Sequence, residues 1–125
     1  DSLLISKDDS IAELCVYNVL NTPDLYLPLR CTLFGHGLKD HLIDGLKTLK
    51  YKESDRVLSL DIELDKFRYG KKNANINTHK DHRIGMSIAP LSLIYDEIII
   101  NDPEVVSKSY PNYWEDLLEA GFIIS

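Results

Sequence analysis

The sequence predicts an α/β domain, or a layered α+β one, in which helices cover a sheet. Three observations support this fold class. Segments with strand character alternate with helical patterns at intervals of roughly 30 residues. Apolar residues make up 44% of the 125 residues and charged residues 27%, as in globular proteins that bury a core. Charged helix starts also recur after predicted strands, which indicates a repeated strand–helix unit.

The chain is predicted to begin with two strands and a helix. Residues 3–5 are a short apolar run, and residues 11–20 alternate in character, as in a half-buried strand. Residues 22–24 (Thr-Pro-Asp) then predict a helix start with a hydroxyl cap, a proline in the first turn and an acidic residue. Pro28 predicts an irregular first part, because a proline in a helix interior removes a hydrogen bond. Residues 35–37 (Gly-His-Gly) are expected to end this helix.

The middle of the chain is predicted to hold a strand, a helix and a loop. Residues 41–49 are predicted to be the strand, and the helical pattern starts at Glu53. Leu58 and Ile62 are expected to widen the apolar stripe of this helix. The stripe itself consists of Val57, Leu60, Leu64 and Phe67. The polar, turn-rich residues 68–77 are predicted to be the loop.

The last third is predicted to hold two more helices and two strands. One helix runs from Asp81 to Ile94 with a kink at Pro90, and the final helix opens at Pro111. The apolar runs at residues 97–100 and 122–124 are predicted to be strands.

The charge balance and the cysteines exclude several classes of protein. The 14 basic and 20 acidic residues give a formal charge of −6, which argues against nucleic-acid binding. A few local cations can still bind a small anion, because salt screens distant charges. No run approaches the roughly 20 apolar residues of a membrane helix. Cys15 and Cys31 lack a CxxC spacing and are interpreted as free buried thiols. Since the chain starts at Asp1 without an initiator Met, we expect it to begin inside a longer sequence or after processing.

Charged residues gather where predicted strands give way to helices. A helix N-terminus exposes free N–H groups and favours anions, and an arginine there can hold a carboxylate or phosphate through two parallel hydrogen bonds. Together the cations would form a site for a small phosphorylated or carboxylated substrate, within which Asp24 and Glu53 are candidates for proton transfer. The clusters are Asp24; Lys52, Glu53, Asp55 and Arg56; Lys80, Asp81, His82 and Arg83; and Lys108.

The same clusters have ordinary interpretations. A helix start of this composition is commonly a solvated turn with local ion pairs, and His82 can be a surface or cap-bonding histidine. The four histidines show no metal-binding spacing, so no metal is expected. Neither GxGxxG nor GxxxxGK[ST] occurs, so a nucleotide site lacks support. Residue types and spacing alone therefore predict an α/β domain with a candidate anion site.

Four segments, in the expected order, resemble motifs of the EPSP synthase (3-phosphoshikimate 1-carboxyvinyltransferase) family. Residues 102–117 (Asp-Pro-Glu-Val-Val-Ser-Lys-Ser-Tyr-Pro-Asn-Tyr-Trp-Glu-Asp-Leu) are similar to its C-terminal signature. Residues 81–86 (Asp-His-Arg-Ile-Gly-Met) resemble its Asp-His-Arg-Met-Ala-Met helix start, and residues 52–56 (Lys-Glu-Ser-Asp-Arg) its Lys-Glu-Thr-Asp-Arg motif. Residues 22–24 resemble its Pro-Asp helix start.

The resemblance implies a fold and a reaction. The family has two globular domains built from βαβαββ units, an inside-out α/β barrel with helices inside and sheet outside. Residues 1–125 would be an incomplete C-terminal part of it, with the N-terminal domain absent. The implied reaction transfers the enolpyruvyl group of phosphoenolpyruvate to the 5-hydroxyl of shikimate 3-phosphate and releases phosphate. No cofactor is implied, and the cytoplasm is the expected location for a bacterial member.

The resemblance also implies roles toward the shikimate ligand. Asp24 would hold the shikimate hydroxyls and act as the base toward the attacking oxygen. Lys52 would bind the same ligand, as would Thr48, which stands where some members carry Asn. Glu53 would move the proton at the methylene carbon of phosphoenolpyruvate.

A second group of roles concerns phosphoenolpyruvate itself. Arg56 and Arg83 would clamp its carboxylate, and Lys108 would neutralise its phosphate. Asp81 and His82 would support Arg83 and Glu53.

The sequence departs from the family in two ways. Residues 67–78 are too few for the β-hairpin that the family carries between the two motif helices. The family's Lys-Ser and Ser-Ser-Gln motifs and an essential arginine lie upstream of this chain, so we expect the chain alone to be inactive. Two alternatives therefore stay open: a non-catalytic folded fragment or decayed domain, and the sister transferase that acts on UDP-N-acetylglucosamine.

Overall fold

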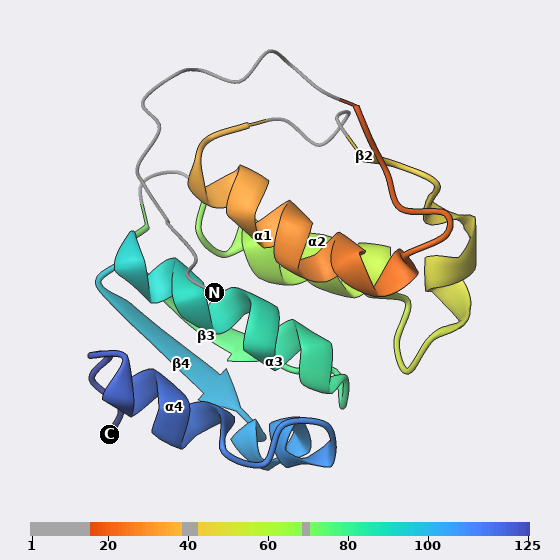
Figure 1. Cartoon of the computed structure of the whole chain (residues 1–125). Helices are drawn as coiled ribbons and strands as arrows, with labels where there is room; N and C mark the ends of the chain where they lie inside the picture. Colours follow the sequence, from red (N-terminus) through yellow and green to blue (C-terminus); the bar gives the residue numbers. More distant parts are fainter. Residues whose placement is uncertain (1–15, 39–42, 69–70) are drawn as a thin grey trace, which may run out of the picture.

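Four α-helices and four short strands alternate through residues 16–38, 43–68 and 71–125, which are the residues that the computed structural model describes (Figure 1). The helices are α1 (Tyr26–Gly35), α2 (Arg56–Asp65), α3 (His82–Ile88) and α4 (Tyr113–Glu119). The strands are β1 (Tyr17–Asn18), β2 (Ile43–Asp44), β3 (Asn73–Asn77) and β4 (Glu97–Asn101). Among the 3-10 helices are η1 (Pro23–Leu25), η3 (Leu46–Tyr51), η4 (Ala89–Leu93) and η5 (Pro103–Lys108).

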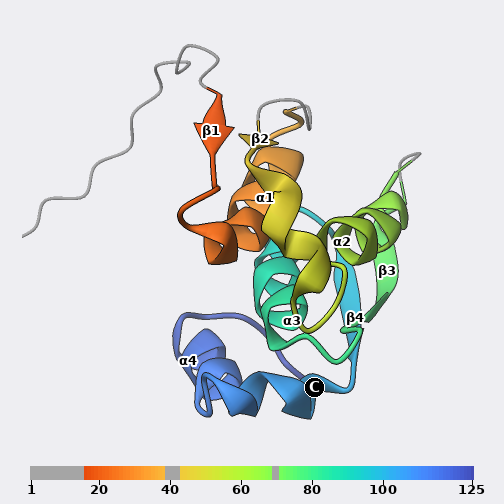
Figure 2. The ribbon, with the colours of Figure 1, turned by 90° about the vertical axis from the view of Figure 1, so that its right-hand side faces the viewer.

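The strands pair in parallel, β1 with β2 and β3 with β4. Parallel neighbours need a long crossover, and α3 with η4 supplies it between β3 and β4. The helices α1, α2 and α3 lie on one side of the β3–β4 pair, and α4 lies at the opposite end of the molecule from β1 and β2 (Figure 2). The predicted mixture of helices and strands is confirmed. The described strands form two separate pairs, so the inside-out barrel stays a prediction.

One hydrophobic core joins α1, α2, α3 and the inner face of β3. Burial of each large apolar side chain there contributes about 1.5–3 kcal/mol relative to an exposed one. The core side chains with no exposed surface are Leu27, Leu49, Leu60, Ile76, Ile84 and Ile88. This shared core fixes the helix starts relative to one another, and the charged residues are at those starts.

The predicted loop over residues 68–77 is wrong, because its last five residues form β3. Ala74 and Ile76 are buried while Asn73, Asn75 and Asn77 are exposed, which is the period-two pattern of a strand with one solvated face. Three asparagines disguised this pattern, since asparagine is depleted in strands and typical of turns.

Helix α2 confirms the predicted stripe and corrects its borders. Leu60, Leu64 and Phe67 are buried, whereas Leu58 and Ile62 are 58% and 46% exposed and do not widen the stripe. The helix begins at Arg56 rather than Glu53, because the side chain of Asp55 accepts the backbone N–H of Leu58 as an N-cap.

Two predicted strands are largely absent from the described residues. Of the predicted strand at residues 41–49, the structure describes residues 43–49, and within these only Ile43–Asp44 are extended, because Gly45 takes a left-handed conformation with φ of 82° and η3 follows. A Cβ atom at Gly45 would stand 2.5 Å from the backbone nitrogen of Leu20, so only glycine fits. Residues 122–124 form no strand, and Ile123 is 98% exposed.

Helix starts and kinks agree with the sequence only in part. The helix expected at residues 22–24 begins as η1 and continues as α1, which confirms the irregular first part, but the Thr22 side chain makes no capping bond. The helix expected over residues 81–94 turns from α3 into η4 just before Pro90, as predicted. The final helix starts at Tyr113, two residues after Pro111.

Some predictions lie outside the described residues: the strand at residues 3–5, the first part of the strand at residues 11–20, and Cys15. Cys31 is free and buried, and burial raises the pKa of its thiol to about 12. No helix in the described part of the chain is long and apolar enough to cross a membrane.

Candidate active site

Charged side chains from four segments converge at neighbouring helix ends. Asp24 lies in η1. Lys52 and Glu53 lie between η3 and α2, and Arg56 is the first residue of α2. The start of α3 and the end of η5 complete the set, with Asp81, His82, Arg83 and Lys108. Burial of the apolar faces of these helices brings their polar ends together.

Asp24 lies at the centre of three cations. Its Oδ1 accepts a hydrogen bond from Nη1 of Arg56 at 2.8 Å and lies 3.8 Å from Nζ of Lys52. Its Oδ2 lies 3.1 Å from Nη2 of Arg83. Burial raises the pKa of Asp24, but the Arg56 hydrogen bond and the charges of Arg83 and Lys52 outweigh it, so the pKa lies below its ordinary value. Asp24 is therefore an ionised carboxylate at neutral pH.

Arg56 joins this group to the start of α3 through a buried ion pair. Its Nε donates to Oδ2 of Asp81 at 2.8 Å, and the two side chains are only 3% and 0% exposed. Burial lowers the pKa of Arg56, but its bonds to Asp81 and Asp24 outweigh that effect and raise it. Asp81 also accepts the backbone N–H of Arg83 at 3.1 Å and thereby caps α3. One carboxylate thus holds the side chain of Arg56 and the backbone of Arg83.

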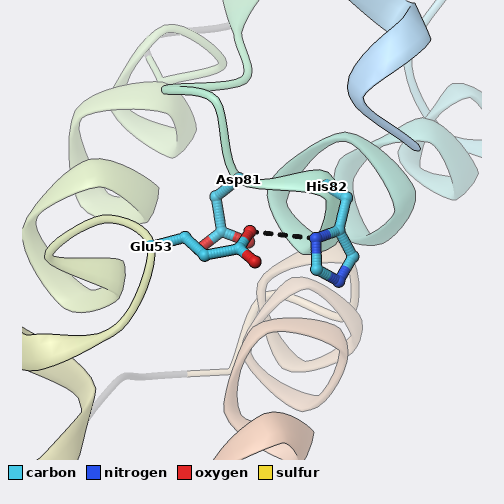
Figure 3. A group of neighbouring side chains, drawn as sticks. All are labelled: Glu53, Asp81 and His82. Carbon is cyan, nitrogen blue, oxygen red and sulfur yellow. Dashed lines mark hydrogen bonds and ion pairs between the residues drawn. The ribbon is translucent and has the colours of Figure 1, made fainter. Parts of the chain in front are cut away.

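Glu53 contacts two further predicted site residues, Lys108 and His82. Its Oε1 accepts from Nζ of Lys108 at 2.5 Å, and its Oε2 lies 2.9 Å from Nδ1 of His82 (Figure 3). The Lys108 hydrogen bond lowers the pKa of Glu53; burial opposes it, and His82 lowers it further. Glu53 is therefore also ionised at neutral pH, held between two side chains from separate elements.

Glu53, Asp81 and His82 are arranged closely enough to suggest a metal site. One ligand atom from each lies within 4.8 Å of the others. Lys108 and Arg56 already neutralise the two carboxylates. A metal ion would have to displace those cations from both carboxylates, so this donor set does not suit a metal ion.

Thr48 is the predicted site residue that these contacts leave out. It is exposed on η3, and none of the ion pairs or hydrogen bonds described above involves it.

The sequence analysis did not single out two residues that bond to the site or lie near it, Ser54 and Glu63. Ser54 donates to Oδ2 of Asp81 at 3.1 Å, and its place inside residues 52–56 was the available signal. Glu63 is a fully buried acid on α2, three residues after Leu60 on the apolar face, where an acid is unexpected.

A cavity of about 570 Å³ borders the cluster between α1 and the α3–η4 segment. Arg83 lies in its wall, but most of the lining is apolar, with Cys31, Met86 and Leu91 among the contributors. The cavity therefore adjoins the charged cluster without forming the anion site.

Comparison with known proteins agrees with these motifs. The sequence pattern of the EPSP synthase (3-phosphoshikimate 1-carboxyvinyltransferase) family matches residues 12–117. That range includes every residue of the cluster described above. No solved structure matched the chain.

Several relatives carry the name 3-phosphoshikimate 1-carboxyvinyltransferase. One from Bacteroides fragilis is 41% identical over 94% of this chain and 33% of its own length. Relatives from Aquifex aeolicus and Clostridium kluyveri are 38% and 35% identical over 69% and 85% of this chain. The chain thus spans a third or less of the length of these relatives.

The alignment with the Bacteroides fragilis relative also shows that this chain is shorter than the matching part of the relative. It covers 138 positions, although 94% of this chain is about 118 residues, so about 20 positions of the relative have no counterpart here. The absence of the family's β-hairpin between the two motif helices would leave a gap of about this length. Four ordered motifs, the clustered side chains and the matched pattern agree, and the chain belongs to the EPSP synthase family.

Proposed function

We propose that this chain supplies part of the active site of an enzyme that transfers the enolpyruvyl group of phosphoenolpyruvate to the 5-hydroxyl of shikimate 3-phosphate. The carbon–oxygen bond to phosphate breaks, a new ether bond forms to the shikimate oxygen, and phosphate leaves. The observation that carries the proposal is the convergence of Lys52, Arg56 and Arg83 on Asp24, beside Lys108 on Glu53. The four cations outnumber the three carboxylates paired with them, those of Asp24, Asp81 and Glu53, and they suit a small substrate that carries both a carboxylate and a phosphate.

Arg83 is the side chain best placed to bind the substrate carboxylate. It is 35% exposed, whereas Arg56 is 3% exposed and bound to Asp81. A carboxylate that enters beside Asp24 can accept bidentate hydrogen bonds from Arg83 and share the charge of Arg56. Lys108 is 64% exposed and can turn from Glu53 to the phosphate of the same molecule.

Substrate binding would also prepare the two acids for proton transfer. Without substrate, Arg56, Arg83 and Lys52 hold the pKa of Asp24 low, which makes it a weak base. A bound carboxylate competes for these cations, so the pKa of Asp24 rises and the group becomes a stronger base toward the shikimate hydroxyl. The same reasoning applies to Glu53 when Lys108 turns to the phosphate.

The rest of the protein is part of the proposal. Residues 1–125 would be the last part of the C-terminal domain, and a preceding N-terminal domain would hold the phosphate of shikimate 3-phosphate. The reaction would take place in the cytoplasm.

Titration of the chain with phosphoenolpyruvate tests the binding part of the proposal. We expect Arg83→Ala to weaken binding by about tenfold, the effect of losing one charge-assisted contact. Arg68→Ala is the matched control, because Arg68 is also exposed and also paired with an aspartate, Asp65, but lies at the far end of α2. Calorimetry, or chemical shifts of the arginine side chains, would measure both affinities.

Two results would count against the proposal. Equal affinity in Arg83→Ala and the unaltered chain would place the anion elsewhere. Equal loss in Arg83→Ala and Arg68→Ala would show that binding follows net charge alone.

A further inference from the structure

A second polar cluster centres on the buried carboxylate of Glu63. This carboxylate has no exposed surface. Its Oε2 accepts from the backbone N–H of Asn77 at 2.9 Å and from Nζ of Lys66 at 2.6 Å. Its Oε1 lies 2.8 Å from Nε2 of His79. The three partners come from the end of α2, the end of β3 and the turn that follows β3.

That turn has an uncommon backbone conformation. His79 and Lys80 take φ values of 52° and 58°, so two consecutive residues other than glycine are left-handed. The clash of Cβ with the backbone disfavours this conformation, and it persists only where surrounding contacts impose it. On His79 the contact is the ring bond to Glu63, and on the preceding strand end it is the bond from Asn77 to the same carboxylate.

The turn leads directly into the candidate site. The backbone N–H of Asp81 bonds to the carbonyl of Thr78 at 2.9 Å, which closes the turn over His79 and Lys80. Asp81 then holds Arg56 and caps α3 ahead of Arg83. The conformation of the turn therefore decides where the start of α3 stands.

We propose that Glu63 is a positioning residue, which holds the turn at His79 and Lys80 left-handed and thereby sets Asp81, His82 and Arg83 for anion binding. This inference rests on the proposed function for its anion, but its conformational part does not. A leucine at position 63 would extend the apolar stripe of α2, whereas a buried carboxylate is unfavourable unless it is well paired. Glu63 accepts from the Asn77 N–H and the His79 ring and neutralises Lys66, which also donates to the carbonyl of Asn75; these contacts explain why an acid stands there.

The experiment uses the ¹⁵N-labelled chain and four variants. We expect Glu63→Leu to shift the signals of the Arg56 Nε–H and the Arg83 amide and to weaken phosphoenolpyruvate binding about tenfold. Glu63→Gln should keep both within about threefold, because its carbonyl oxygen can accept from Asn77 and Lys66 while its NH₂ donates to neutral His79. Asp65→Asn is the control. It also removes a negative charge, two positions after Glu63, but from a side chain that is exposed.

The decisive variant is His79→Gly added to Glu63→Leu. Glycine takes a left-handed φ without strain, so part of the lost affinity and the original arginine signals should return. If Glu63→Leu leaves these signals unchanged, or if His79→Gly restores nothing, Glu63 serves the core alone and the proposal is overturned.

Two further comparisons keep the test decisive. If Glu63→Leu does not fold, His79→Ala and His79→Gly replace it, because both lose the ring and only alanine keeps the strain. The proposal then requires alanine to shift the arginine signals more than glycine does, and equal shifts overturn it. If the unaltered chain does not bind phosphoenolpyruvate, the proposed function fails on that count, while the arginine signals still decide the role of Glu63.

Discussion

At the residue scale, Arg56 explains why the cluster behaves as a network rather than as separate ion pairs. Its buried guanidinium contacts both Asp24 and Asp81. Removal of one partner of a buried pair leaves an uncompensated charge, at a cost of about 3–5 kcal/mol, although the pair itself adds little over apolar packing. Asp24, Asp81 and Arg56 therefore contribute mainly by fixing one arrangement of charges.

Glu53 provides a prediction about pH at the same scale. Lys108 and His82 hold its pKa below the ordinary value of 4.5, so the folded state binds fewer protons than the unfolded state as pH falls below 4.5. The stabilisation is present above that pH and is lost as pH falls through the folded pKa. We expect Glu53→Gln to flatten the decline of the free energy of unfolding below pH 4.5, measured by urea unfolding across pH.

Asp65→Asn is a useful comparison for this pH series, because Asp65 is 61% exposed and paired only with the exposed Arg68. The decline in the free energy of unfolding of this variant at acid pH should match that of the unaltered chain. An unchanged decline in Glu53→Gln as well would mean that the Lys108 contact does not persist in solution.

At the scale of elements, left-handed backbone conformations precede two of the short helices, α3 and η5. Asp102, like His79 and Lys80, is left-handed, and each of these departures precedes a helix that carries site residues. A left-handed residue other than glycine costs about 1–2 kcal/mol. The packing of α3 against α1 and η5 has to outweigh that cost.

Helix α3 carries a glycine whose replacement tests this packing. Gly85→Ala should favour the helix by up to about 1 kcal/mol. A Cβ atom there would stand 3.2 Å from Cγ2 of Val106, which is fully buried in η5 and must shift. We expect a net stabilisation smaller than the full helical gain, and the full gain when both chains of the comparison carry Val106→Ala. Urea unfolding measures both differences.

A destabilised Gly85→Ala would show that η5 cannot move away from α3. An equal gain in both backgrounds would show that the contact with Val106 is softer than its distance suggests.

At the scale of the whole molecule, the proposed function makes this chain one side of a two-sided site. It carries the cations proposed for phosphoenolpyruvate, whereas the family motifs expected to hold the shikimate phosphate would lie upstream of it. The surface also keeps large apolar side chains in solvent, including Tyr51 at 83% exposure and Leu93 at 75%. Leu93 lies in the wall of the cavity beside Arg83.

We therefore expect the 125-residue chain alone to show no turnover. The measurement is phosphate release from phosphoenolpyruvate and shikimate 3-phosphate, with the Bacteroides fragilis relative as the positive control. Without the upstream motifs expected to hold the shikimate phosphate, the two reacting atoms would not be brought together, and proximity accounts for a large part of such rate enhancements. Product formed by the purified chain would contradict this expectation.

Particular residues show which features could be predicted from the sequence and which could not. The stripe of Leu60, Leu64 and Phe67 was readable because helical periodicity is local and regular. Strand β3 was not readable, because its exposed asparagines match a turn better than a strand. Glu63 was visible as an acid on an apolar face, but its three donors are separated from it in sequence by up to 16 residues.

The sequence by itself determined the residue types of the site, their order and the family to which the chain belongs. Each motif is a continuous run of residues, so each can be recognised in the sequence without knowledge of the fold. Only the tertiary structure decided that Asp24 faces three cations, that Asp81 joins two arginines, and that Thr48 stands apart. Apart from the cap that Asp81 forms two residues ahead of Arg83, those relations span 25 to 59 positions and depend on a shared core and on backbone conformations such as those of His79 and Lys80. No local pattern encodes them.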